Sequence, residues 1–213
     1  MKHITKKQKK GRSTNVNELI YGAHPIIEAL KAGKRKLESI YTTKPFPKGW
    51  RRVEQFLPKK PVTINYIPRE SLTRMAGTTD HMGIIAWMSL FPFKKELFNP
   101  LKAPKILLLD AVQDVRNLGA IIRSAHCTCF DGIVLCKGNS APLGPATLKA
   151  SAGLTEHMSI FIAPSMAWAA QELKKSGYNL YMAVLENGVD TRTQNFEGPT
   201  CIVIGNEATG ISP

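Results

Sequence analysis

The sequence predicts an α/β protein in which a small α+β domain precedes a domain built on a mostly parallel sheet. From Lys105 onward, short continuous apolar runs alternate with helical stretches, which is typical of parallel strands covered on both faces. Residues 17–90 mix short alternating strands with helices and carry many basic side chains. Residues 91–104 contain three prolines and no clean periodicity, which predicts a semi-extended linker between the two domains.

The first domain can be justified element by element. A helix is expected to begin at His24-Pro25, because proline is favoured in the first helical turn, and to end at Gly33. Its apolar residues Ile26, Ile27 and Leu30 fit one face of that helix. The remaining elements expected here are strands at 37–43, 62–67 and 83–88 and helices at 53–57 and 68–75.

The second domain, residues 105–213, follows a regular strand–helix alternation. Strands are expected at 106–109, 133–136, 159–163, 180–185 and 201–204, with helices at 118–128, 145–151 and 166–176. In sheets of this kind ligands bind beyond the carboxyl ends of the strands. The loops that follow these strands are therefore the first place to look for chemistry.

Length and composition exclude several classes of protein. The chain has 213 residues, 43% of them hydrophobic and 21% charged, which is ordinary for a globular protein with a buried core. A collagen-like, disordered or disulfide-scaffold protein is thereby excluded. No apolar stretch approaches the roughly 18 residues that a membrane span needs, so no membrane association is expected. The basic N-terminus is not followed by an apolar segment, so it is not a secretory signal.

The excess of positive charge lies in the first half of the chain. The formal net charge is +13, made up of +14 over residues 1–104 and −1 over residues 105–213. Residues 1–16 carry six Lys or Arg and no acid, which predicts a disordered basic tail. This asymmetry favours a surface that binds a polyanion, the alternative being a lysine-rich solubilising surface. The candidate contacts are Lys31, Lys34, Arg35, Arg51 and Arg52.

The cysteines predict neither a metal site nor disulfides. They lie at positions 127, 129, 136 and 201, without a C-x-x-C pair and without a histidine pair at ligand spacing nearby. We therefore expect reduced thiols, no bound metal and a cytoplasmic protein.

The loop that precedes the first helix of the second domain leads to Asn117 and Arg123. Asn117 is a good candidate for the N-cap of that helix. Gly119 and Arg123 are four residues apart and share a helix face, where the missing side chain of Gly119 leaves room for another group to approach closely. Arg123 lies in an otherwise apolar stretch and needs an anionic partner, either a protein carboxylate or a ligand phosphate.

The loop after the last strand carries Gly205, Glu207 and Gly210. The two glycines allow unusual backbone angles and close approach of a ligand. Glu207 is expected either to bind a ligand or to pair with Arg123. The chain has no G-x-G-x-x-G and no Walker motif, so the usual dinucleotide and triphosphate signatures are missing.

Several motifs, in order, resemble one enzyme family. NLGAIIRSA at 117–125, KASAG at 149–153 and IVIGNEATGIS at 202–212 are similar to motifs of the SpoU (TrmH-type) RNA ribose 2′-O-methyltransferases. YGAHPIIEALKAG at 21–33 and HMGIIA at 81–86 resemble the small substrate-binding domain of the ribosomal-RNA guanosine methyltransferase branch. The resemblance implies a SPOUT-type trefoil-knotted domain, a homodimer, S-adenosylmethionine as cofactor and RNA as substrate. Ribosomal RNA is favoured over transfer RNA.

The resemblance also implies roles for individual residues. It assigns the family's catalytic asparagine, arginine and glutamate to Asn117, Arg123 and Glu207, and its cofactor contacts to Gly205, Gly210 and Ile211. The very high pKa of arginine argues against a general base, so we expect Arg123 to act as a cationic clamp on the 2′-oxygen or a phosphate. Asn117 would orient it and Glu207 would fix its geometry.

Two departures from the family pattern stand out. Val115 follows Asp114 where the family usually has proline, and the family's third motif does not follow the second within these 213 residues. We therefore expect a methyltransferase domain truncated at its C-terminus, with an incomplete knot. The alternatives are a non-catalytic RNA-binding module, an inactive truncated methyltransferase, or another α/β ligand-binding enzyme.

Overall fold

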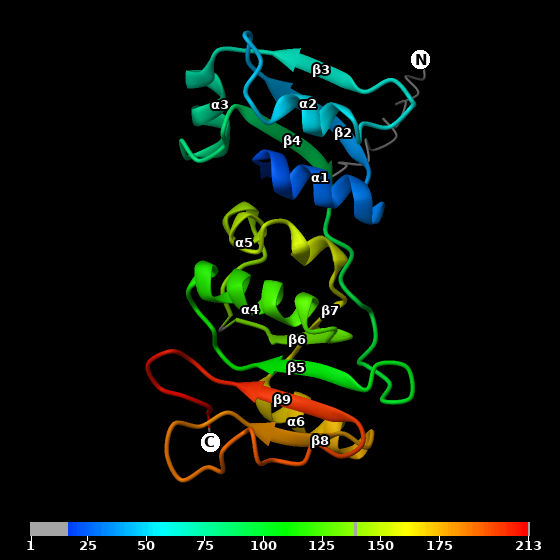
Figure 1. Ribbon diagram of the computed structural model, residues 1–213, viewed down its shortest axis with the longest axis vertical. Helices are drawn as coiled ribbons and strands as arrows, with labels where there is room; N and C mark the ends of the chain where they lie inside the picture. The colour runs from blue at the N-terminus through cyan, green and yellow to red at the C-terminus, as the bar shows by residue number, and fades with distance from the viewer. Residues whose placement is uncertain (1–16, 139, 213) are drawn as a thin grey trace, which may run out of the picture.

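The computed structural model describes residues 17–138 and 140–212, and it shows two α/β units stacked end to end (Figure 1). The predicted basic tail, residues 1–16, lies outside the described residues. None of the helices in these ranges is long and apolar enough to cross a bilayer.

The first unit is built on a four-stranded sheet in the order β1-β4-β2-β3. β4 pairs antiparallel with β1 and β2, whereas β2 and β3 run parallel. The predicted elements are confirmed with small shifts, and β1 is an additional strand. Its elements are β1 (Asn17–Tyr21), α1 (Ala23–Ala32), β2 (Leu37–Thr42), α2 (Trp50–Glu54), β3 (Thr63–Tyr66), α3 (Arg69–Ala76) and β4 (Ile84–Ser89).

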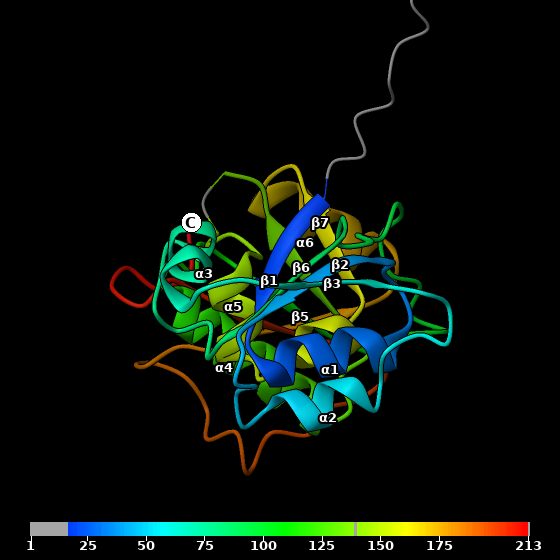
Figure 2. The same cartoon turned by 90° about the horizontal axis from the view of Figure 1, so that it is seen from above.

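Helices cover both faces of this sheet (Figure 2). Ile26 and Ile27 of α1 pack with Trp50 of α2 on one face, and Leu72 of α3 packs on the other. α1 ends where predicted, at Gly33, whose φ of 62° is a left-handed conformation that glycine adopts without strain.

The second unit is a five-stranded, wholly parallel sheet in the order β7-β6-β5-β9-β8. Leu107 and Leu109 pack against α4 on one face, and Leu108 packs on the other face in the cluster that includes α6. This confirms the predicted fold class, while the trefoil knot stays a prediction. The elements are β5 (Lys105–Leu109), α4 (Val115–Cys127), β6 (Gly132–Cys136), α5 (Pro145–Ala150), the 3-10 helix η1 (Leu154–His157), β7 (Ile160–Ala163), α6 (Met166–Lys175), β8 (Asn179–Met182) and β9 (Thr200–Ile204).

The segment between the units, residues 91–104, has no regular helix, but two of its side chains pack into the second unit. Phe91 and Phe98 are buried in the second unit. The ring of Phe98 occupies the space that a side chain at position 132 would need, which explains Gly132 at the start of β6. The prolines predict the irregular backbone correctly, but they do not reveal this anchoring.

The two units share a packed interface made by α5 and η1 against the first unit. Leu148 of α5 belongs to the apolar core of the first unit. A Cβ at Gly153 would lie 2.9 Å from the Cα of Pro25, so the backbones approach closely here. Nearby, Lys149 Nζ donates a hydrogen bond of 2.8 Å to the carbonyl oxygen of Asp80.

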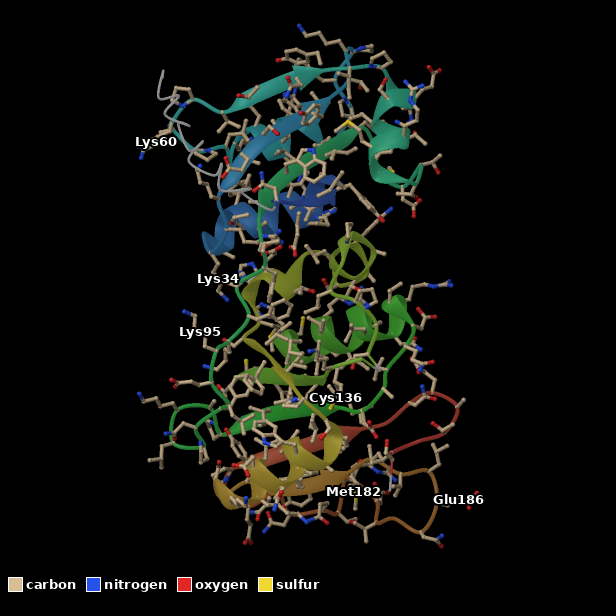
Figure 3. All side chains as sticks on the ribbon, turned by 180° about the vertical axis from the view of Figure 1, so that it is seen from behind. Lys34, Lys60, Lys95, Cys136, Met182 and Glu186 are labelled. Carbon is tan, nitrogen blue, oxygen red and sulfur yellow. The ribbon has the colours of Figure 1, made fainter. Side chains whose placement is uncertain are left out.

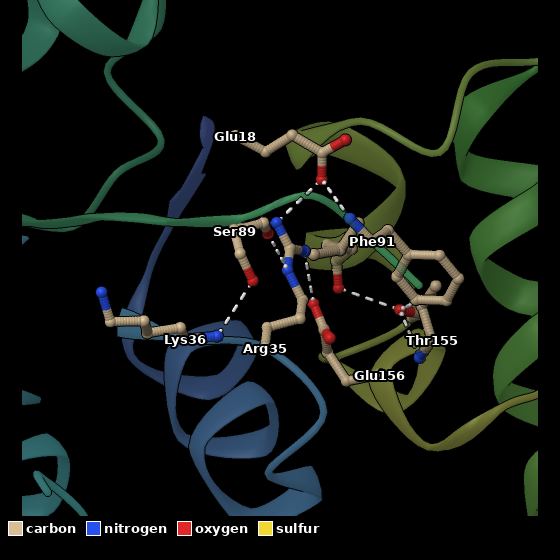
Figure 4. A network of polar contacts seen from close by, with 9 residues as sticks. Glu18, Arg35, Lys36, Ser89, Phe91, Thr155 and Glu156 are labelled. Atoms are coloured by element: carbon tan, nitrogen blue, oxygen red, sulfur yellow. Dashed lines mark hydrogen bonds and ion pairs between the residues drawn. The ribbon is translucent and has the colours of Figure 1, made fainter. Parts of the chain in front are cut away.

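Arg35 is the polar centre of this interface (Figure 4). Its guanidinium donates to Glu156 Oε1 at 2.9 Å, to Glu18 Oε2 at 2.8 Å and to the carbonyl oxygen of Ser89 at 2.7 Å. The side chains of Arg35 and Glu156 are both 0% exposed. The prediction that Arg35 contacts RNA is therefore wrong, because its side chain is buried and each of its three guanidinium nitrogens donates to a protein group.

Candidate active site

Three loops meet at the carboxyl edge of the parallel sheet. The first loop (110–114) follows β5, the second loop (137–144, of which residue 139 is not described) follows β6, and the third loop (205–212) follows β9. Asn206 Nδ2 donates to the carbonyl oxygen of Ala111 at 2.8 Å. The backbone N–H of Ala141 donates to the carbonyl oxygen of Val112 at 2.8 Å. The first loop is thereby held between the other two.

Glu207 of the third loop docks on the start of α4. Its Oε1 accepts hydrogen bonds from Asn117 Nδ2 at 3.0 Å and from the backbone N–H of Asp114 at 3.3 Å, and Oε2 accepts from Gln113 N–H at 3.4 Å. The hydrogen bond from Asn117 is the largest cause that lowers the pKa of Glu207. The carboxylate thus stays ionised at neutral pH and holds the two motif-bearing loops together.

The start of α4 differs from the prediction. Asp114 is the N-cap, and its side chain accepts a hydrogen bond from Arg116 N–H at 2.6 Å. The prediction of Asn117 as N-cap is wrong, because the helix begins earlier and Asn117 is its third residue. Val115 takes the first helical position, where proline is favoured but not required, so this departure from the family pattern costs no hydrogen bond.

Arg123 does not pair with Glu207. Its side chain is exposed, and it forms no ion pair with any residue that the structure describes. Six residues separate it from Asn117, which is about 9 Å along a helix. The predicted pairing fails because Asn117 and backbone amides already satisfy Glu207.

The space beside Gly119 is filled by the protein itself. A Cβ at this position would lie 2.9 Å from the backbone carbon of Ala150, so α5 packs directly on α4. The room that the missing side chain of Gly119 leaves is therefore taken by α5. Arg123 lies one turn further along the same helix face, beyond this contact.

The glycines of the third loop have different roles. A Cβ at Gly205 would clash with the backbone of Gly210, because the loop folds back on itself. Asn206 and Gly210 exchange backbone hydrogen bonds of 2.8 and 3.0 Å. Gly210 has a φ of +72° and open space where a side chain would be. Ile211 is half-buried against the core.

A cavity of about 190 Å³ opens beside the second loop. Lys137, Ser140 and Leu143 line it. The hydroxyl of Ser140 is buried and has no hydrogen-bond partner among the described residues. Side chains at Gly138 or Gly144 would meet no atom within 4 Å. Sequence reasoning missed Ser140, because a small polar loop after a strand carries no signal of its own.

The other predicted RNA contacts are on the surface of the first unit. Arg51 and Arg52 are exposed on α2. Lys31 is exposed and forms an ion pair of 2.8 Å with Glu28. Lys34, at the junction of the units (Figure 3), donates to the carbonyl oxygen of His157 at 3.1 Å. None of these residues lies in the three loops.

The parallel sheet, its helices on both faces and the joined loops at one edge define an α/β protein with a ligand site at its strand ends. No group of three or more His, Cys, Asp or Glu able to hold a metal occurs in the described part of the chain. Residues 104–213 match the model of the SpoU rRNA Methylase family, and residues 19–92 match the model for RNA 2′-O ribose methyltransferase substrate binding. The chain belongs to the SpoU rRNA Methylase family.

Individual relatives agree with this assignment. A putative TrmH family tRNA/rRNA methyltransferase, YacO of Bacillus subtilis, is 30% identical over 203 residues, which are 92% of this chain and 80% of the relative. Among solved structures, an RNA 2′-O ribose methyltransferase has a TM-score of 0.79 at 21% identity, covering 94% of this chain and 76% of that one. AviRb of Streptomyces viridochromogenes, solved with AdoMet, has a TM-score of 0.74 at 20% identity, covering 92% and 75%.

Proposed function

We propose that this protein transfers a methyl group from S-adenosylmethionine to a ribose 2′-hydroxyl of RNA, with ribosomal RNA favoured over transfer RNA and guanosine as the nucleotide. The observation that carries the proposal is the contact between Asn117 and Glu207, which joins two family motifs at the ligand-binding edge of the sheet. In this proposal the domain of residues 17–90 binds the substrate RNA, the segment of residues 91–104 links the two domains, and the domain of residues 105–213 catalyses methyl transfer.

The residues at this edge fit a nucleoside cofactor. Ser140 offers a buried hydroxyl without a partner, and Gly210 leaves open space beside a half-buried Ile211. Gly205, Gly210 and Ile211 would hold S-adenosylmethionine through their backbone, and the cavity of the second loop would take part of it. The cofactor, when bound, supplies an electrophilic methyl group on a sulfonium.

The chain's own residues position the RNA. The Arg123 guanidinium serves as a cationic clamp on the 2′-oxygen or a neighbouring phosphate rather than as a base. Asn117 and Glu207 act through α4. By fixing the start of the helix, they set the direction in which Arg123 projects, and so they are positioning residues.

Transfer of labelled methyl groups from S-adenosylmethionine to RNA tests the function. A 2′-O-methylated nucleotide resists alkaline cleavage at its 3′ phosphodiester, because the attacking hydroxyl is blocked. We expect label in alkali-resistant dinucleotides. Label in alkali-sensitive nucleotides would mean base methylation, and RNA binding without transfer would support the non-catalytic alternative.

The variant Arg123→Lys tests the clamp. Lysine keeps the charge but loses the planar fork, so kcat should fall on the order of 100-fold. Arg116→Lys, an exposed arginine on the same helix, is the matched control and should leave kcat unchanged. A near-normal kcat for Arg123→Lys would remove Arg123 from the mechanism.

We also propose a homodimer, as the family resemblance implies. Met182, at the end of β8, lies at the end of the molecule away from the first unit (Figure 3), and Val184, Leu185 and Val189, which follow it in the chain, are also exposed. An apolar patch of this kind is typical of an interface. Light scattering measures the mass directly, and a monomer of 23.5 kDa at all concentrations would contradict the proposal.

A cytoplasmic location is proposed on the free thiols. Cys127 and Cys129 are exposed and unpaired in disulfides, which is typical of proteins in reducing compartments.

A further inference from the structure

A second cavity lies in the first unit, far along the chain from the three loops. It has a volume of about 600 Å³ and opens at the carboxyl ends of the parallel strands β2 and β3. Thr43, Lys44, Pro45, Tyr66, Pro68 and Arg69 are among its lining residues. The arrowheads of β3, β5 and β9 all point to the same side of the molecule in Figure 1.

Exposed aromatic rings form one side of this region. Tyr66 is 46% exposed and Phe46 is 48% exposed. Phe46 stacks on the buried Trp50, with ring centres 5.4 Å apart and planes within 5°, and its ring centre lies 5.9 Å from that of Tyr66. The buried tryptophan holds Phe46 in place at the surface. Rings fixed in this way offer a stacking surface at little cost in side-chain entropy.

The charge at this cavity is positive. Lys44 Nζ lies 4.2 Å from the ring centre of Tyr66, and Arg69 lines the same cavity at the start of α3. Neither forms a salt bridge with a residue in the described ranges, and the cavity lining includes no acid. An aromatic face beside two available cations suits a ligand that is both flat and anionic.

We propose that this cavity binds one unpaired nucleotide of the substrate RNA, with the base stacked on Tyr66 and the adjacent phosphates held by Lys44 and Arg69. The proposal rests on the proposed function, because it treats the ligand as the RNA that is methylated. The Lys44 ammonium over the ring is the group that the base replaces. Its long flexible stem lets it move to the phosphate without leaving the cavity.

A nucleotide suits this cavity better than an acidic peptide does. Carboxylates would use the two cations but leave the face of Tyr66 without a partner. A nucleotide uses both features, because its base stacks on Tyr66 and its phosphate binds the cations. Stacking strengthens binding most where the aromatic ring is already fixed in place. The unpaired state matters, because a base inside a duplex presents only its edge.

Fluorescence anisotropy with labelled RNA tests the proposal. The probes are a hairpin with an unpaired loop and a fully paired duplex of the same length. Tyr66→Ala should weaken binding of the hairpin on the order of 10-fold or more and leave duplex binding unchanged, because the duplex does not stack. Tyr66→Phe keeps the ring and should bind within about twofold of the unmodified protein.

Paired arginine variants test the phosphate contact. Arg69→Gln should weaken hairpin binding and reduce its dependence on salt. Arg74→Gln, five residues further along α3 and outside the cavity lining, should do neither. Circular dichroism confirms that each variant is folded.

The outcomes separate the two proposals. Hairpin binding by Tyr66→Ala equal to that of the unmodified protein, with methyl transfer intact, would overturn the cavity assignment and leave the function standing. If Tyr66→Ala loses methyl transfer at subsaturating RNA and recovers it at saturating RNA, the cavity assignment is supported, because KM for RNA has risen while kcat is unchanged. Equal competition by a polyglutamate peptide would overturn the choice of RNA as ligand. An unmodified protein that neither binds RNA nor transfers methyl groups would overturn both.

Discussion

Replacing Arg35 by methionine should destabilise the protein strongly, although Arg35 lies in none of the three loops of the candidate active site. The Glu156 side chain is 0% exposed and has Arg35 as its charged partner at 2.9 Å, while its other oxygen has no hydrogen-bond partner among the described residues. Removing the guanidinium leaves a buried carboxylate without compensation, which costs about 3–5 kcal/mol. For a domain of modest stability this is a large part of the total.

The loss should depend on pH. Burial raises the pKa of Glu156, and Arg35 opposes that rise. Without Arg35 the folded-state pKa rises further above its unfolded value, so the folded variant gains stability by taking up a proton. Its deficit relative to the unmodified protein is therefore full at pH values above that raised pKa and shrinks as the pH falls through it toward the ordinary range of glutamate.

Urea unfolding followed by tryptophan fluorescence measures this difference. The double variant Arg35→Met, Glu156→Gln is the control. It removes both buried charges and should recover much of the loss, because apolar or neutral replacement of a buried pair is often tolerated. A loss below about 1 kcal/mol for Arg35→Met at neutral pH, or a deficit that does not change with pH, would refute the reasoning.

Two further changes test packing and electrostatics elsewhere in the fold. Gly119→Val should lower the free energy of unfolding by about 1–3 kcal/mol, because the valine side chain would overlap α5. Gly144→Ala, whose Cβ would lie in open space, is the control and should change it little. Equal urea midpoints for the two variants would contradict the close packing at Gly119. Burial raises the pKa of Glu28, but hydrogen bonds from Lys31 and His157 outweigh it and lower the pKa overall. The unmodified protein should therefore be more stable than Glu28→Gln at neutral pH, and this difference should vanish as the pH falls through the lowered pKa of Glu28. A difference in unfolding free energy that stays constant over this pH range would count against the pairing.

The fold was largely predictable because its signals are local. The apolar runs that became β5, β6 and β9 and the stop at Gly33 need no long-range information. β1 was missed because its pattern becomes meaningful only when β4 lies beside it. The burial of Phe98 depends on the absent side chain at Gly132, a relation between distant residues that no window of sequence displays.

The site was predictable only in part, and for a related reason. The resemblance named Asn117 and Glu207, and the structure places them in contact. It did not indicate which atoms Glu207 would bind, because three donors near the start of α4 compete with Arg123 for one carboxylate. Charge counting likewise included Arg35 among surface residues, because composition does not distinguish an exposed arginine from one neutralised by Glu18 and Glu156.

Leu148 inserts into the core of the first unit, and the buried Arg35–Glu156 pair crosses the same interface, so separating the two units would expose apolar and charged groups. An RNA that contacts both units must then span a distance that the packed interface fixes. If both proposals hold, methyl transfer should depend on the distance between the reactive ribose and the nucleotide bound in the cavity of the first unit, and the same RNA sequence folded to a shorter or longer distance should be a poor substrate.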